Sequence, residues 1–274
     1  MAFTTKIATE KDLAAALVVE KDTMGDYVYL QDAWHHFEGQ KGGLVCVCDD
    51  DIMVGIGRFT VLPDGTGWLE TLRVSPKWQR KGVGRLIYNE YLRLAKQHGC
   101  PSMAMFTGLT NVASSGLAEV FGLQTVAQHK GWHLENLAGG NPHSFAAVNW
   151  QRAEQLICGK KEEYHNYMSL NRTFYRINGQ NARQFAAEGK VYADSEGSFI
   201  VCGARFQHHK ALHIAMMGGN PDHCIDFAVS LAKAQNVPKI SCTFAQDNSA
   251  LQAALANRGF VPESGTIITK EIVF

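Results

Sequence analysis

A short basic segment containing glycine, between an expected strand and an expected helix, constrains this chain most strongly. Residues 68–74 are rich in apolar and β-preferring types, and Pro76 then removes a backbone donor, so the strand should end there. From Val83 onward, apolar residues recur every three or four positions, which predicts a helix to about His98. The order strand, loop, helix brings unpaired N–H groups and the positive end of a helix dipole to the loop, as anion sites require.

The loop itself has the chemistry to bind a phosphate. Gly82 and Gly84 have no Cβ, so their amides can approach phosphate oxygens closely, and Arg80, Lys81 and Arg85 add cationic donors. For so short a motif, a basic turn before an ordinary surface helix is the alternative. The two common nucleotide-binding loops fit poorly, because no Gly-Lys-Ser/Thr follows and the third glycine of the dinucleotide fingerprint is missing.

Residues 79–84 resemble the acetyl-CoA loop of the GNAT superfamily of N-acetyltransferases, which reads Gln/Arg-x-x-Gly-x-Gly/Ala after a strand ending in Val-x-Pro. A second family element, Asn-x-x-Ala-x-x-Leu-Tyr-x-x-x-Gly-Phe, is expected further along the chain. The chain keeps Asn111, Leu117 and Gly122 of this element and replaces its Ala, Tyr and Phe by Ser114, Ala118 and Leu123. Together the two motifs extend the resemblance over residues 3–135.

The resemblance implies an α/β fold, with a mixed β-sheet flanked by helices, and an acetyl-CoA site without a metal. In this family the fourth strand supplies backbone hydrogen bonds to the pantetheine arm and the thioester carbonyl. The cofactor-binding residues expected from the resemblance are Leu72, Arg73, Val74, Gln79, Arg80, Lys81, Gly82, Val83, Gly84, Arg85, Asn111 and Ser114.

Glu70 is the expected general base. It precedes Leu72 by two residues on the same strand and so shares its face, and many relatives use a glutamate on this strand, through water, to take the proton of the amine. A structural ion pair between Glu70 and an arginine such as Arg58 is the alternative. Both interpretations remain open at the level of sequence.

The general acid is less defined, because Ala118 stands where the family has a tyrosine. Tyr88, Tyr27 or Tyr29 could replace it, or the thiolate could leave without help. The aromatic segment before the first expected hairpin covers the acceptor in this family. We therefore expect Tyr27, Tyr29 and Trp34 to bind the acceptor substrate.

The second half of the chain partly repeats the first. The offset is 137 residues (248 − 111 = 137), and it aligns several positions at once. Leu231-Ala232-Lys233 matches Leu94-Ala95-Lys96, while Pro238, Asn248 and Gly259 match Pro101, Asn111 and Gly122. We therefore predict two GNAT-type folds in tandem, residues 1–137 and 144–274, joined by a linker at Ala138 to Pro142.

The repeat does not preserve the phosphate loop. At the same offset Met216, Met217 and Gly218 replace Gln79, Arg80 and Lys81, Pro221 replaces Gly84, and Asp222 replaces Arg85. The positive charge is lost, and Asp222 is able to cap its own helix. The second half is expected to be structural or to shape the acceptor site.

Composition excludes several other classes of function. Lys plus Arg and Asp plus Glu both number 26, which gives no electrostatic reason to expect nucleic acid or a membrane surface as a partner. Neither a signal-peptide core nor an apolar run of transmembrane length is present, so a cytoplasmic location is expected. The seven cysteines are scattered and form no C-x-x-C pair, which argues against a disulfide framework or a zinc site.

These observations predict an N-acetyltransferase that transfers acetyl from acetyl-CoA to a primary amine of a small molecule or amino acid, by direct attack in a ternary complex. The neutral chain has no obvious acidic track for a basic peptide, which favours a small acceptor. A catalytically silent acyl-CoA sensor is the alternative, because the usual tyrosine is missing. The chain is expected to act as a monomer with pseudo-dimeric halves or as a homodimer.

Overall fold

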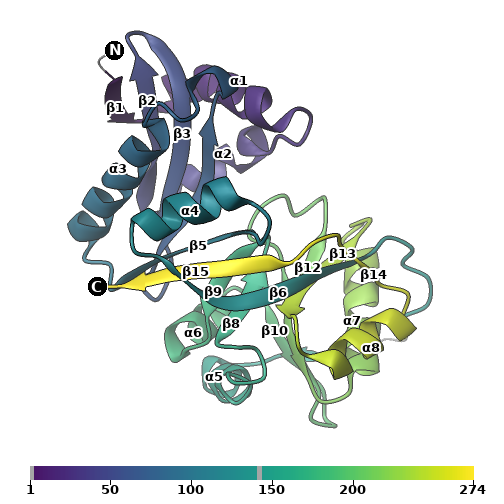
Figure 1. Cartoon of the computed structure of the whole chain (residues 1–274). Helices are drawn as coiled ribbons and strands as arrows, with labels where there is room; N and C mark the ends of the chain where they lie inside the picture. The colour runs from purple at the N-terminus through teal and green to yellow at the C-terminus, as the bar shows by residue number, and fades with distance from the viewer. Residues whose placement is uncertain (1–2, 141–143) are drawn as a thin grey trace. The chain divides into compact units, whose positions relative to one another are not determined.

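The computed structural model describes residues 3–140 and 144–274, and these form two compact units (Figure 1). Unit 1 contains residues 3–106, Asn111–Gln124 and Lys270–Phe274. Unit 2 contains Thr107–Thr110 and Thr125–Thr269. No helix among the described residues is both long and apolar enough to span a membrane.

Unit 1 alternates strands and helices in the order expected from the sequence. Its elements are β1 (Phe3–Ile7), the 3-10 turn η1 (Glu10–Asp12), α1 (Leu13–Met24), α2 (Leu30–Glu38), β2 (Gly42–Asp49), β3 (Ile52–Val61), β4 (Gly67–Val74), the 3-10 turn η2 (Pro76–Trp78), α3 (Val83–His98), β5 (Ser102–Gly108) and α4 (Val112–Val120).

The sheet of unit 1 is mixed. β1, β2, β3 and β4 follow one another as antiparallel neighbours, and β4 then pairs with β5 in parallel. The helix α3 makes the crossover between those two parallel strands, as a parallel pair requires. The expected α/β fold, with a mixed β-sheet flanked by helices, is confirmed.

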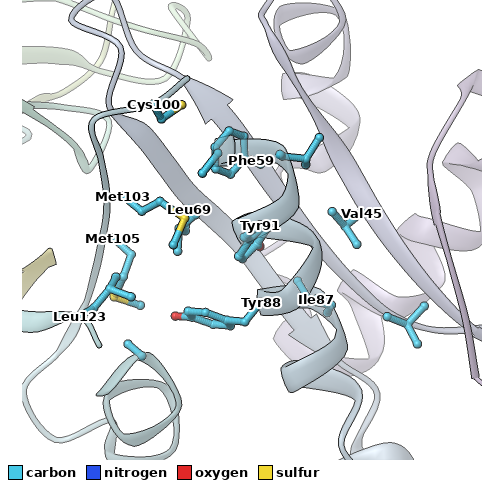
Figure 2. Packing of buried hydrophobic residues seen from close by; sticks show 14 of the residues in the cluster. Val45, Phe59, Leu69, Ile87, Tyr88, Tyr91, Cys100, Met103, Met105 and Leu123 are labelled. Carbon is cyan, nitrogen blue, oxygen red and sulfur yellow. The ribbon is translucent and has the colours of Figure 1, made fainter. Parts of the chain in front are cut away.

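The core of unit 1 lies between this sheet and α3 (Figure 2). Apolar side chains recur along α3 at helical spacing, as the sequence predicts, and they meet residues of four strands. The buried members include Val83, Ile87, Tyr88, Tyr91 and Leu94 from α3, with Val45, Phe59, Leu69, Met103 and Met105 from the strands.

The helix α2 was not expected, because its stretch of aromatic and histidine residues has weak helix propensity. A buried carboxylate explains why it forms. Glu20, which is fully buried, accepts the backbone N–H groups of Tyr29 and Leu30 at 3.0 to 3.2 Å. These donors belong to the helix N-terminus, where a negative charge is favourable. The contact joins two separate helices, so the helical pattern of either one alone does not reveal it.

Unit 2 repeats this succession of strands and helices. Its elements are β6 (Gln124–Leu134), β7 (Ala146–Ala147), α5 (Trp150–Cys158), β8 (Tyr167–Leu170), β9 (Thr173–Arg176), α6 (Gly179–Ala187), β10 (Val191–Ala193), β11 (Phe199–Gly203), β12 (Leu212–Gly218), α7 (Pro221–Ala234), β13 (Ile240–Ala245), α8 (Ser249–Asn257), β14 (Val261–Pro262) and β15 (Ile267–Val273).

In unit 2 the strands β7, β10, β11 and β12 are antiparallel neighbours, and β12 pairs with β13 in parallel across α7. This is the same arrangement as β1 to β5 around α3. The predicted hairpin of β10 and β11 is confirmed, although β11 ends at Gly203 instead of Phe206. On the far side of β13 lies β6, which is antiparallel to it.

The compact units do not follow a single cut between residues 137 and 144. The strand β6 belongs to unit 2 from Thr125 onward, whereas β15 enters unit 1 at Lys270. In unit 1 this last strand lies beside β5, and the Phe274 amide donates to the Pro101 carbonyl at 2.9 Å. Two residues of the expected linker, Asn141 and Pro142, lie outside the described residues.

Candidate active site

The strands β4 and β5 separate part-way along their length. They pair from Gly67 with Met103 to Leu69 with Met105, and no pairing continues beyond that point among the described residues. The later part of β4, from Glu70 to Val74, therefore has backbone groups that do not bond to β5. The result is a fork between two parallel strands, with peptide groups along one of its sides.

A β-bulge lies where the fork opens. Arg58 of β3 faces Glu70 and Ile56 faces Arg73, so β4 carries one residue more than its partner. Thr71, in the bulge, has a φ of 59°, which is rare and costly for a β-branched residue. Its hydroxyl forms a hydrogen bond with the Tyr29 hydroxyl at 2.8 Å. That bond ties the strained residue to the start of α2.

The loop before α3 leaves helix amides unpaired. Gly82 precedes the first helical residue and has a φ of 89°, in the left-handed region that glycine tolerates. Its carbonyl accepts the amides of Arg85 and Leu86 at 3.0 and 3.1 Å. The amides of Val83 and Gly84 have no acceptor within the part of the chain that the structure describes. A Cβ on Gly82 would meet nothing within 4 Å, so the space in front of these amides is open.

Three cationic side chains surround this open space. Arg80, Lys81 and Arg85 are all exposed, and none of them forms an ion pair with a described residue. Lys81 lies over the Trp78 ring, with Nζ 4.6 Å from the ring centroid. Free amides, a helix dipole and mobile positive charges together fit a polyphosphate such as that of CoA. The expected phosphate-binding residues therefore lie together.

Two backbone carbonyls of the fork are bonded to side chains of unit 1. The Arg73 guanidinium donates through Nη1 to the Leu72 carbonyl at 2.8 Å, and Gln79 Nε2 donates to the Val74 carbonyl at 3.2 Å. A pantetheine arm would have to displace these bonds or use neighbouring N–H groups. The expected backbone contacts of Leu72, Arg73 and Val74 remain predictions.

Asn111 and Ser114 have a structural role in this geometry. The Asn111 side chain accepts the Ser114 amide at 3.2 Å and so caps α4, as its place before the helix predicts. Four residues after Ser114, Ala118 is completely buried in the core of unit 1. The oxygen that Asn111 could offer to a cofactor is therefore already bonded to the helix.

Glu70 is 9% exposed and is held by a hydroxyl. Thr60 donates to Glu70 Oε1 at 2.7 Å, and Arg58 Nε donates to the same Thr60 oxygen at 3.1 Å. Arg58 Nη2 donates to the carbonyls of Phe37 and Gln40 at 2.9 and 3.1 Å. Arg58 thus anchors the end of α2, and Thr60 links its side chain to that of Glu70.

The three aromatic residues expected to bind the acceptor lie in different environments. Tyr27 is 84% exposed, whereas Trp34 is 5% exposed and its Nε1 has no partner among the described residues. Tyr29 is half-buried against the bulge, and burial raises the pKa of its hydroxyl. Tyr29 and Glu70 therefore lie in one region of unit 1, while Trp34 is part of the core.

Residues 9–123 match the model of the acetyltransferase (GNAT) family. This part of the chain is a GNAT acetyltransferase domain. The match covers the fork, the phosphate loop and both motifs identified in the sequence. Comparison with curated protein sequences gives no match.

The whole chain also resembles solved GNAT structures. A GCN5-related N-acetyltransferase from Sphaerobacter thermophilus has a TM-score of 0.65 at 12% identity, covering 99% of this chain and 95% of that one. A tandem GNAT protein from the clavulanic acid biosynthesis pathway has a TM-score of 0.60 at 14% identity, covering 99% and 98%. A GCN5-related N-acetyltransferase from Kribbella flavida reaches 0.56 at 12% identity, covering 99% and 71%. At these identities the likeness concerns the fold, and the predicted tandem GNAT architecture is confirmed.

The second GNAT fold has a comparable fork, but a side chain fills it. β12 and β13 pair from Leu212 with Ile240 to Ile214 with Cys242 and then separate. The buried Tyr164 hydroxyl donates to the Met217 carbonyl at 2.7 Å and accepts the Met217 amide at 3.0 Å. One phenol thus satisfies both the N–H and the C=O group of one residue in this fork.

The phosphate loop of the second fold is deleted. Met216 and Met217 lie on β12, so the constant-offset alignment of these residues with Gln79 and Arg80 was wrong. Only residues 219 and 220 join β12 to α7, where residues 75–82 join β4 to α3. An alignment with one constant offset cannot reveal a deletion when an insertion elsewhere in the chain restores the offset.

The helix cap also differs from the prediction. Asn220 Oδ1 accepts the Asp222 amide at 3.0 Å and caps α7. Asp222 itself forms an ion pair with Arg258 at 3.0 Å. The amides at this helix end are thus partly used by the chain, and a carboxylate stands nearby. Among the described residues, no cluster of three or more His, Cys, Asp or Glu side chains could hold a metal ion.

Proposed function

We propose that this protein transfers an acetyl group from acetyl-CoA to a primary amine of a small molecule or amino acid, by direct attack in a ternary complex. One observation carries the proposal. The open, cationic N-terminus of α3 adjoins a fork in the sheet, and a buried carboxylate, Glu70, lies where that fork opens. Binding and proton-transfer groups are thus combined in unit 1.

The loop would hold the donor through its phosphates. Helix amides and the side chains of Arg80, Lys81 and Arg85 would neutralise the negative charge, while the backbone of Leu72 to Val74 would align the pantetheine arm. Peptide N–H groups in the fork can also stabilise the negative charge that develops on the thioester oxygen. Acetyl-CoA would supply the activated acyl group, and the chain would position it.

Glu70 is the proposed base. A carboxylate is able to take, through an intervening water, the proton that a neutral amine loses as its nitrogen attacks the thioester, and Thr60 fixes the orientation of Glu70 by its hydrogen bond at 2.7 Å. Tyr29 and Thr71 lie close to the same part of β4 and are proposed to line the acceptor site with Tyr27. Trp34 would support this region from within the core.

Calorimetry and a coupled amine screen test the proposal. One CoA per chain is expected in the calorimetric titration, because among the described residues only the N-terminus of α3 combines free amides with positive charge. Thiol release from acetyl-CoA should then depend on an added amine. A stoichiometry near two would contradict the assignment of unit 2 as degenerate.

A silent acyl-CoA sensor is the second candidate, favoured by the buried alanine at position 118 where the resemblance leads one to expect a tyrosine. The two functions differ in one measurement. CoA binding without thiol release for any amine in a broad panel would support the sensor and exclude the transferase.

A further inference from the structure

The proposed transfer needs a proton for the departing thiolate, and the sequence offers three tyrosines of unit 1 as candidates for the acid. Two of them are placed elsewhere. Tyr27 is 84% exposed, and the Tyr29 hydroxyl is bonded to Thr71 at 2.8 Å. The third is Tyr88, which is 1% exposed and points inward from α3.

Tyr88 lies at the base of the fork. It shares a core cluster with Leu69 and Met105, the last residues that β4 and β5 pair before they separate. Figure 2 shows its hydroxyl directed from α3 toward Met105 and Leu123. The ring is fixed in that direction, because it stacks on Phe121 with centroids 4.8 Å apart.

Ala118 makes room for this arrangement. It is fully buried in the same cluster as Tyr88, so a larger residue there would compete for the volume that the Tyr88 ring occupies. The Tyr88 phenol, from α3, thus approaches the region that a larger residue at position 118 of α4 would fill. The small residue at position 118 and the tyrosine at position 88 are complementary.

The hydroxyl of Tyr88 has no hydrogen-bond partner among the residues that the structure describes. The hydroxyl oxygen is also not completely buried, so it lies at the edge of the core. By contrast, the neighbouring Tyr91 hydroxyl donates to the Glu70 carbonyl at 3.5 Å. A phenolic hydroxyl at the edge of the core, without a partner among the described residues, is free to donate to a ligand.

We propose that Tyr88 is the catalytic acid of this transfer, donating its phenolic proton to the CoA sulfur as the carbon–sulfur bond breaks. The inference rests on the proposed function and deepens it. Burial raises the pKa of Tyr88, so the phenol keeps its proton at neutral pH and is available as a donor.

The proton balance of the step is complete. The amine nitrogen forms a bond to the thioester carbon and loses one proton to Glu70 through water. As the tetrahedral species collapses, the carbon–sulfur electron pair passes to sulfur, which takes one proton from Tyr88. The products are the amide and the free thiol of CoA, and the two side chains return to their starting states by proton exchange with water.

Titration of bound CoA tests the proposal without a known acceptor. A hydrogen bond from Tyr88 to the sulfur favours the thiolate and lowers the pKa of the bound thiol. In Tyr88→Phe that pKa should rise by about one to two units, the size expected for a hydrogen bond to a charged group. The measurement is the ultraviolet absorbance of the thiolate as a function of pH, with CoA saturating. Turnover with any amine found by the screen should fall on the order of 100-fold.

Tyr91→Phe is the matched control, because it removes a buried hydroxyl from the same helix and should leave the thiol pKa unchanged. Equal thiol pKa values in the parent and Tyr88→Phe would overturn the proposal. So would loss of CoA binding in Tyr88→Phe, since the hydroxyl would then serve packing or binding. If the parent itself does not bind CoA, the proposed function fails, and this outcome is separate from the other two.

Discussion

The N-termini of α3 and α7 occupy the same position in the topology of the two units, but their chemical environments differ. Before α3 a loop of residues 75–82 ends in Gly82, and the first amides of the helix face open space. Before α7 only residues 219 and 220 intervene, and Asn220 supplies the cap. The fold therefore provides a helix end behind a fork, but the length of the loop decides whether that end can accept a phosphate.

The two forks also differ in the side chains that bond to their backbone groups. In unit 2 the Tyr164 hydroxyl bonds to both the amide and the carbonyl of Met217. In unit 1 the corresponding strand has a bulge at Thr71, and its Leu72 and Val74 carbonyls accept hydrogen bonds from the Arg73 and Gln79 side chains. A buried phenol in a core is difficult to displace, whereas half-exposed or exposed side chains can rotate away. Unit 2 has thus been closed by its own side chains.

The largest expected effect comes from separating the two halves of the chain. A fragment of residues 1–140 lacks Lys270–Phe274, which belong to unit 1. The buried Lys270 bonds to Glu119 at 2.7 Å, and Ile272 packs against the core of unit 1. We expect the fragment to aggregate and to lose CoA binding, as measured by light scattering and calorimetry.

A point substitution gives a graded version of that experiment. Ile272→Ser in the full chain should lower the melting temperature, because it replaces an apolar side chain that packs against the core. Val273→Ser changes the next residue of the same strand, which is 65% exposed, and should have little effect. If the fragment of residues 1–140 were soluble and fully active, the end of the chain would contribute neither to the core nor to the pocket.

Glycine substitutions at the two helix ends compare their roles directly. Gly82→Val places a side chain in the open space before α3, so CoA affinity should fall on the order of 100-fold, which is about 2.7 kcal/mol. Gly219→Ala would put a Cβ 2.6 Å from the Ser198 Cα, which should destabilise unit 2 and leave CoA affinity unchanged. Calorimetry and thermal unfolding separate the two outcomes. Loss of CoA affinity in Gly219→Ala would reverse the assignment of the sites.

Glu70→Gln tests the chemistry proposed for unit 1. Turnover should fall by about 10²- to 10⁴-fold up to about pH 8, because a general base is removed while CoA affinity stays nearly intact. Thr60→Val is the matched control, since it keeps the carboxylate and removes only the hydroxyl that orients it. Turnover of Glu70→Gln within about threefold of the parent would show that Glu70 has a structural role and is not the base.

The smallest expected effect is a difference in acid stability between the units. In unit 2, burial lowers the pKa of His129 to about 3 and that of His213 to about 4. Because the unfolded histidines bind protons near pH 6.5, the unfolded state binds more protons between that pH and the folded pKa values. Stability should therefore fall as the pH drops below about 6.5, by about 2 kcal/mol in total at pH 5.5.

Hydrogen exchange at pH 7 and pH 5.5 can locate this loss. Amides of unit 2 should exchange faster at the lower pH, whereas those of unit 1 should change less. His129→Gln should flatten the pH dependence, since the proton-binding difference at that position is removed. An identical acid response in parent and variant would show that His129 does not contribute.

The sequence by itself determined the features that depend on neighbours along the chain. The strand, loop and helix around Gly82 and the periodicity of α3 are local patterns, and the structure contains both as predicted. Repeated motifs at one offset also identified the tandem fold. Such features are readable because chain-local hydrogen bonding and periodicity produce them.

Tertiary structure alone decided the rest. α2 depends on a carboxylate from α1, the fork of unit 2 is closed by Tyr164 from a distant turn, and unit 1 is completed by the last residues of the chain. Each of these contacts joins different elements of the structure, so no pattern of neighbouring residues encodes it. The direction of the Tyr88 hydroxyl also depends on tertiary structure, because the packing of α3 against the sheet and Phe121 sets it.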